Sequence, residues 1–186
     1  MAAILDRFIH IIDENSLSPE DIKEVQFTPH AIGLNRMWKE NELRTEEDFG
    51  FHGPYLIACA AYRKKKVDFQ NSDTREDTNI RDFMKRVKVL PDYHEGFGTS
   101  MLEDPITRVM SVEVLAKGKS YKETSRYIEW SWRPEEVRAT DDDLVDKFNE
   151  IVTGFLPSNK IKKSTDTLLT LEEVKNVNDL TEMLVP

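Results

Sequence analysis

The stretch that decides the fold is residues 107–132, which read TRVMSVEVLAKGKSYKETSRYIEWSW. Two runs rich in β-branched and aromatic residues flank a short turn that contains Gly118, and this order is typical of a β-hairpin. If Lys117 pairs with Tyr121 across a three-residue turn, alternation places one apolar row on one face: Met110, Val112, Val114, Ile128, Trp130 and Trp132. The other face then carries polar side chains: Ser111, Glu113, Glu123, Ser125 and Glu129.

The rest of the chain mostly has the pattern of amphipathic or buried helices. Apolar residues recur at helical spacing in residues 2–14 and 144–152, and Pro54 opens an alanine-containing apolar run typical of a buried helix. Ser18-Pro19-Glu20-Asp21 predicts the start of a further short helix. A lone hairpin is only marginally stable, so helices must cover it or strands such as Val87–Leu90 must extend it. The sequence therefore predicts an α+β fold, a mostly helical single domain packed on a small antiparallel sheet built around the 107–132 hairpin.

The distribution of polar residues predicts three segments. Residues 1–156 form the globular α+β domain, and residues 157–169, which are polar and contain three lysines, form a linker. Residues 170–186 form a C-terminal amphipathic docking segment that opens with the capping box Thr170 to Glu173. Its interaction residues recur every three or four positions: Leu171, Val174, Val177, Leu180 and Leu184. Docking on its own domain and docking in a groove of another chain both remain open.

Charge and cysteine content limit the classes of function. The 186-residue chain has 26 Lys plus Arg against 35 Asp plus Glu, and the net charge of −9 argues against general binding to a nucleic-acid backbone. Four consecutive cations, Arg63 to Lys66, suit a helix C-terminus, although a phosphate contact or a targeting signal also fits them. The lone Cys59 cannot form an internal disulfide, which favours an intracellular protein. No apolar run approaches the roughly 18 residues of a membrane span, so we expect a soluble protein without membrane contact.

One constellation suggests a catalytic site. Leu90-Pro91-Asp92 precedes a strand that carries Glu113, and three lysines follow: Lys117, Lys119 and Lys122. This order resembles that of metal-dependent nucleases of the PD-(D/E)xK class. The resemblance implies that Asp92 and Glu113 bind Mg or Mn, that His52 or Glu76 adds a ligand, and that one of the lysines acts in catalysis. In this sequence, however, the nearest lysine follows Glu113 by four positions rather than two, and a tight hairpin stands where a helix is usual.

The leading hypothesis is therefore a non-catalytic interaction or assembly subunit without a cofactor. It works through contacts with other protein chains, including copies of itself in a homo-oligomer. The metal-dependent nuclease is the alternative, and a nucleic-acid contact through Arg63, Lys64, Lys65 and Lys66 is a third reading.

Overall fold

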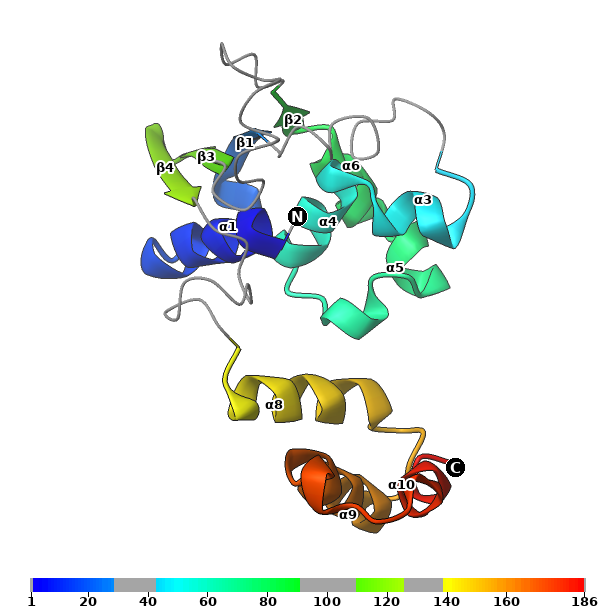
Figure 1. Cartoon of the computed structure of the whole chain (residues 1–186). Coiled ribbons are helices and arrows are strands. Elements are labelled where there is room, and N and C mark those ends of the chain that lie inside the picture. Colours follow the sequence, from blue (N-terminus) through cyan, green and yellow to red (C-terminus); the bar gives the residue numbers. More distant parts are fainter. Residues whose placement is uncertain (1, 29–42, 91–109, 126–138, 186) are drawn as a thin grey trace, which may run out of the picture. The chain divides into compact units, whose positions relative to one another are not determined.

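The computed structural model of the chain describes residues 2–28, 43–90, 110–125 and 139–185. The chain divides into two compact units, Met1–Val137 and Arg138–Pro186. The elements of the first unit, in chain order, are α1 (Ala2–Glu14), the 3₁₀ turn η1 (Pro19–Asp21), β1 (Ile22–Thr28), α3 (Glu46–Gly50), α4 (Gly53–Ala61), the 3₁₀ turn η2 (Lys66–Asp68), α5 (Ser72–Glu76), α6 (Thr78–Met84), β2 (Val87–Val89), β3 (Met110–Ala116) and β4 (Lys119–Ser125) (Figure 1). The predicted α+β class is confirmed.

A four-stranded sheet in the order β2-β1-β3-β4 forms one layer of the first unit. The pairs β1–β3 and β3–β4 are antiparallel, whereas β2 joins β1 in parallel, so the sheet is mixed. The prediction of an added strand at Val87–Leu90 is confirmed by β2. Arg86 secures this edge, because its Nη1 donates to the carbonyl oxygens of Pro19 and Ile22, each at 3.0 Å.

The hairpin of β3 and β4 is present, but its predicted register is wrong. The turn has two central residues, Lys117 and Gly118, and Ala116 pairs with Lys119. Both central residues have positive φ, 50° and 73°, as the favoured two-residue hairpin turn requires. Lys117 adopts this conformation, and its Nζ lies 3.2 Å from Asp21 Oδ2. The register shift reverses the parity of β4, so Glu123 lies opposite the buried Val112 and not on the face of Glu113. Ile128, Glu129, Trp130 and Trp132 lie outside the described residues.

The helix predicted after Ser18 is also wrong. Pro19–Asp21 makes only a 3₁₀ turn, and Ile22–Thr28 is the central strand β1. Ile22, Val25 and Phe27 are buried at a spacing that fits neither regular period, because a bulge interrupts the pairing between Ile22 and Glu24. Sheet neighbours on both sides therefore decided the structure of a segment whose local pattern was ambiguous.

The core of the first unit lies between one face of the sheet and the helices α1, α4 and α6. From the sheet it takes Val25, Phe27, Val87, Val89, Val112 and Val114. From the helices it takes Ile4, Phe8, Ile11 and Ile12 of α1, all nine residues of α4, and Ile80 and Phe83 of α6. Because α4 is buried on every side, it is the centre of this unit, and the helix predicted from Pro54 is confirmed.

The second unit is helical and has little buried apolar surface of its own. Its elements are α8 (Asp141–Val152), α9 (Ser158–Leu169), the 3₁₀ turn η4 (Leu171–Glu173) and α10 (Val177–Met183). Residues 157–169, which we expected to form a linker, thus contain the helix α9, and the division between units falls at residue 137 rather than 156. Thr170 ends α9 instead of capping a new helix, since its hydroxyl donates to the carbonyl oxygen of Asp166.

Gly53 is predicted to be indispensable for seating α4 on β1. A Cβ at this position would lie 2.5 Å from Cζ of Phe27, a fully buried ring that has no room to withdraw. Gly53→Ala should lower the free energy of unfolding by about 1–3 kcal/mol, the usual cost of overpacking a core. Chemical denaturation followed by tryptophan fluorescence measures this change.

Gly50→Ala is the matched control. The nearest atom to its added Cβ is Nε2 of Gln70, at 2.9 Å, the end of an exposed and flexible side chain that can move away. We expect a change of less than about 0.5 kcal/mol for this variant. Equal losses in the two variants would contradict the role assigned to the contact between Gly53 and Phe27.

Candidate functional site

The start of α4 combines a histidine cap with close packing. His52 is the N-cap, and its Nδ1 accepts a hydrogen bond from the backbone N–H of Tyr55 at 3.2 Å. The carbonyl oxygen of His52 accepts the N–H of Leu56 at 3.0 Å, and Pro54 has no N–H to satisfy. The first turn of the buried helix is therefore closed largely by His52, a residue type that is uncommon in this role.

Two polar groups lie inside the core below this turn. The Tyr55 hydroxyl donates to the carbonyl oxygen of Phe69, and burial raises the pKa of the phenol well above its usual range. Burial also raises the pKa of the Cys59 thiol to about 11, although the hydrogen bond with Tyr55 opposes this shift. Both groups stay protonated at neutral pH, so Cys59 is a packed thiol rather than a nucleophile.

The sheet face that points away from α4 carries a polar row across all four strands. Lys88 pairs in register with Gln26, Gln26 with Glu113, and Glu113 with Lys122. Neighbouring side chains connect the row, because Lys88 contacts Glu24, Gln26 donates to Glu24, and Ser120 donates to Glu113. The Lys88 hydrogen bond, followed by that of Gln26, holds the pKa of Glu24 below its usual range.

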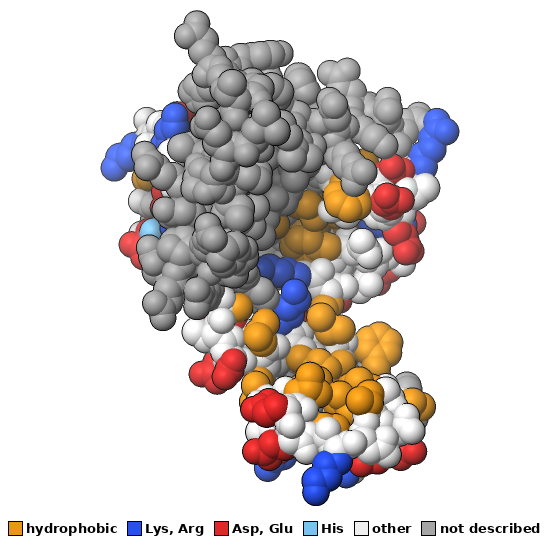
Figure 2. Space-filling model, viewed as in Figure 1, with side chains coloured by type: hydrophobic (Ala, Val, Ile, Leu, Met, Phe, Trp, Pro, Cys, Tyr) orange, Lys and Arg blue, Asp and Glu red, His pale blue; other side chains and the backbone are white. Residues whose placement is uncertain are grey.

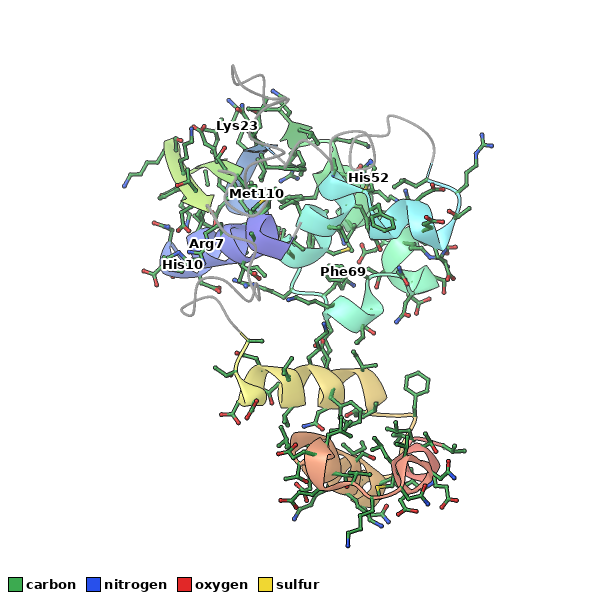
Figure 3. The ribbon with its side chains drawn as sticks, in the orientation of Figure 1. Arg7, His10, Lys23, His52, Phe69 and Met110 are labelled. Atoms are coloured by element: carbon green, nitrogen blue, oxygen red, sulfur yellow. The ribbon has the colours of Figure 1, made fainter. Side chains whose placement is uncertain are left out.

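A second polar cluster joins α1 to the edge strand β4. Figure 3 labels two of its members, Arg7 and His10, on α1. Glu123 Oε1 lies 2.5 Å from Nδ1 of His10, and its Oε2 lies 3.7 Å from Nη1 of Arg7. Glu123 is on the helix-bearing face because of the observed hairpin register, and α1 places the imidazole of His10 and the guanidinium of Arg7 beside this carboxylate. The cluster ties together residues that are 113 positions apart.

The comparison with known families shows which family the chain belongs to. A family model described as the MmgE/PrpD C-terminal domain matches residues 1–173 of the 186. The chain belongs to the MmgE/PrpD family. No curated protein matches the sequence significantly.

The MmgE/PrpD match corrects the functional hypotheses drawn from the sequence. The family consists of dehydratase-like enzymes, so neither the non-catalytic assembly subunit nor the PD-(D/E)xK nuclease is right. Both hypotheses depended on short motifs or on their absence. The family match instead extends over residues 1–173.

The residues of the nuclease alternative do not form one site in the described part of the MmgE/PrpD chain. His52 caps α4 on the helix-bearing side of the sheet, whereas Glu113 lies on the opposite face. Glu76 is the exposed last residue of α5, and Asp92 lies outside the described residues. Within the ranges that the structure describes, no group of three or more His, Cys, Asp or Glu side chains could hold a metal ion.

The three lysines of that alternative also diverge. Lys117 contacts Asp21 from the hairpin turn, and Lys119 is exposed at the start of β4. Lys122 is the cross-strand neighbour of Glu113, so among the described members of the predicted constellation the fold pairs these two. A lysine and a glutamate in opposite strands are a common stabilising pair of a sheet surface.

The basic run lies after the end of α4, and none of its four cations belongs to the last turn of that helix. Arg63, with φ of 54°, follows the C-terminus of the helix and contacts Asp13 of α1. Lys64 Nζ lies 3.1 Å from Oδ2 of Asp77, the N-cap of α6. Lys65 and Lys66 are exposed. Two of the four cations therefore link helices of the MmgE/PrpD unit.

The predicted interaction residues of the C-terminal segment differ in exposure. Leu180 is buried against the second unit, and Val174 is half-buried. Leu171, Val177 and Leu184 are exposed by 51%, 65% and 39%, and Figure 2 shows hydrophobic side chains gathered on this unit. None of the described helices is both long and apolar enough to cross a membrane.

Removing the Lys88 ammonium should raise the pKa of Glu24, because that hydrogen bond is the main cause of its lowered pKa. A carboxylate with a lowered pKa stabilises the fold above its ordinary pKa, and this contribution is lost as the pH falls through the folded-state value. Lys88→Gln should therefore remove a component of acid unfolding that lies below the ordinary glutamate pKa of 4.5. Carboxyl NMR titration of Glu24 measures the shift directly.

Asp82 provides the internal control, since a hydrogen bond from Lys85 lowers its pKa on α6. Lys88→Gln should leave the Asp82 titration unchanged, and Lys85→Gln should move Asp82 alone. A Glu24 titration that does not respond to Lys88→Gln would show that the pair is not formed in solution.

Proposed function

We propose that this chain is the C-terminal domain of a dehydratase-like enzyme and that it acts together with the preceding region of such an enzyme. The observation that carries the proposal is the family match over residues 1–173. A dehydratase removes a proton and a hydroxyl group from neighbouring carbons of its substrate, which requires a base and an acid. The proposal rests on the family and assigns neither role to a residue of this chain.

The second unit supports a docking role within that enzyme. Few of its described residues are buried, namely Leu156, Ser164 and Leu180. Large apolar side chains are exposed on all of its helices and on the turns between them: Leu144, Ile151, Phe155, Leu168, Leu169, Leu171, Val177, Leu184 and Val185. A concentration of exposed apolar residues is typical of an interaction surface. We propose that residues 170–186 dock, with α8 and α9, on another part of the same enzyme or on a second subunit in its oligomer.

The proposal includes an intracellular location. Cys59 is free and buried in the core, and the chain has no second cysteine with which to form a disulfide. A protein of this kind suits a reducing compartment.

Reconstitution tests the proposed function. The full chain is mixed or coexpressed with the preceding region of an MmgE/PrpD enzyme, and a panel of hydroxy acids is screened for the ultraviolet absorbance of a new conjugated double bond. We expect dehydration only when both parts are present. Equal activity of the preceding region with and without this chain would contradict the proposal.

The exposed apolar side chains should matter for docking and not for folding. Phe155 and Val177 are exposed by 74% and 65%, so the double change Phe155→Ser and Val177→Ser should shift the melting temperature of the chain by less than about 1 °C. The same change should weaken association with the preceding region by about tenfold or more, because buried apolar anchors dominate interfaces. Titration calorimetry measures this affinity.

Two controls define the result. Glu172→Ser changes an exposed polar residue of η4 and should leave the affinity unchanged. Leu180→Ser removes a buried side chain of α10 and should lower the stability of the second unit itself. An affinity that is insensitive to the Phe155 and Val177 changes would place the interface elsewhere.

A further inference from the structure

Two arginines converge on one buried aromatic ring where α3, α5 and α6 meet (Figure 1). The ring belongs to Phe49 of α3, which is buried. Cζ of Arg81, from α6, lies 4.8 Å from the ring centroid, and Cζ of Arg75, from α5, lies 5.6 Å from it. Arg81 Nε also donates to the carbonyl oxygen of Arg75 at 2.7 Å, which ties the Arg81 side chain to the end of α5.

The two guanidinium groups bring positive charge together in a partly buried place. An arginine side chain stays charged in proteins, and like charges repel more strongly where water is partly excluded. Arg75 and Arg81 are both half-buried. Both also act on Tyr55, whose ring packs edge-on against Phe49 at 4.9 Å. Burial raises the pKa of the Tyr55 phenol, and the charges of Arg81 and Arg75 oppose that rise.

The described carboxylates near this pair neutralise it only in part. Glu46 Oε1 lies 3.4 Å from Arg75 Nη2, but the Glu46 side chain is 69% exposed, so this is a weak surface ion pair. In the part of the chain that the structure describes, Arg81 contacts the ring and the Arg75 carbonyl but no carboxylate. The other acids of α5, of α6 and of the junction between them are exposed or contact lysines: Asp73, Glu76, Asp77 with Lys64, and Asp82 with Lys85.

One donor of the arginine pair is also unused. Nε of Arg75 is buried and has no hydrogen-bond partner among the described residues, although buried N–H groups nearly always have one. Guanidinium groups bind carboxylates and phosphates through paired N–H groups. An anion seated between Arg75 and Arg81 would therefore supply both the missing negative charge and an acceptor.

We propose that Arg75 and Arg81 form a binding site for an oxyanion, a carboxylate or phosphate group that takes the place of Glu46 beside Arg75. The high exposure of Glu46 allows this exchange, because its side chain can turn into solvent without leaving a buried charge behind. The inference does not depend on the proposed enzymatic function.

Calorimetric titration of the full chain with inorganic phosphate and, separately, with malonate tests the site. Both titrations are run at constant ionic strength, so that general screening does not change. We expect saturable binding of at least one probe, and the tighter probe identifies the class of ligand. Arg81→Gln and Arg75→Gln should each weaken that binding about tenfold or more, the usual effect of losing a hydrogen bond to a charged group. Melting curves without a probe check that both variants are folded.

Two further variants leave both arginines in place. Lys85→Gln removes a positive charge from α6 that pairs with Asp82, so it should leave the affinity unchanged. Glu46→Gln removes the competing carboxylate and should strengthen binding about twofold or more. This gain can be measured even if an arginine variant fails to fold. The proposal is overturned if neither probe binds saturably to the wild type, if Lys85→Gln weakens binding as much as Arg81→Gln, or if Glu46→Gln brings no gain.

Discussion

The close approach of α4 to β1 is the contact on which the rest of the first unit depends. Gly53 leaves no Cβ between the helix backbone and the Phe27 ring, so α4 can lie deep enough for all nine of its residues to be buried. Around this helix, α1 and α6 cover the remaining apolar surface of the sheet. The same depth excludes water from the first turn, which is why its backbone N–H groups need an internal cap. Because the first turn is closely packed, the Tyr55 N–H needs an acceptor within the protein, and Nδ1 of His52 supplies it.

The two faces of the sheet differ in the polarity of their side chains. Helices cover Val25, Val112 and Val114, whereas the polar row from Lys88 to Lys122 occupies the other face. The second unit has the opposite character, because its helices expose apolar side chains and bury few. In this chain of the MmgE/PrpD family, the contrast is what motivates our proposal that the second unit presents apolar surface for association.

Much of the fold could be predicted from residue patterns, and the failures have identifiable causes. The helix of residues 2–14, the buried helix after Pro54 and the existence of the hairpin followed from periodicity. The hairpin register failed because Lys117 adopts a positive φ that a sequence pattern does not assign to lysine. The strand at Ile22–Thr28 failed because its apolar spacing contains a bulge that only its partners β2 and β3 define. The His52 cap was visible only as a residue preceding Gly53-Pro54.

The sequence by itself determined the α+β class and the apolar faces of elements such as the helix of residues 2–14 and the helix after Pro54, because the hydrophobic effect depends on apolar surface and on its period along the chain. It did not determine which side of the sheet Glu123 would face, nor that Lys122 would meet Glu113 while His52 would lie on the other side. Those relations join residues that are distant in the chain. They follow from the two-residue turn at Lys117 and Gly118 and from the packing of α4 on the Phe27 ring. Only the tertiary structure fixes these contacts.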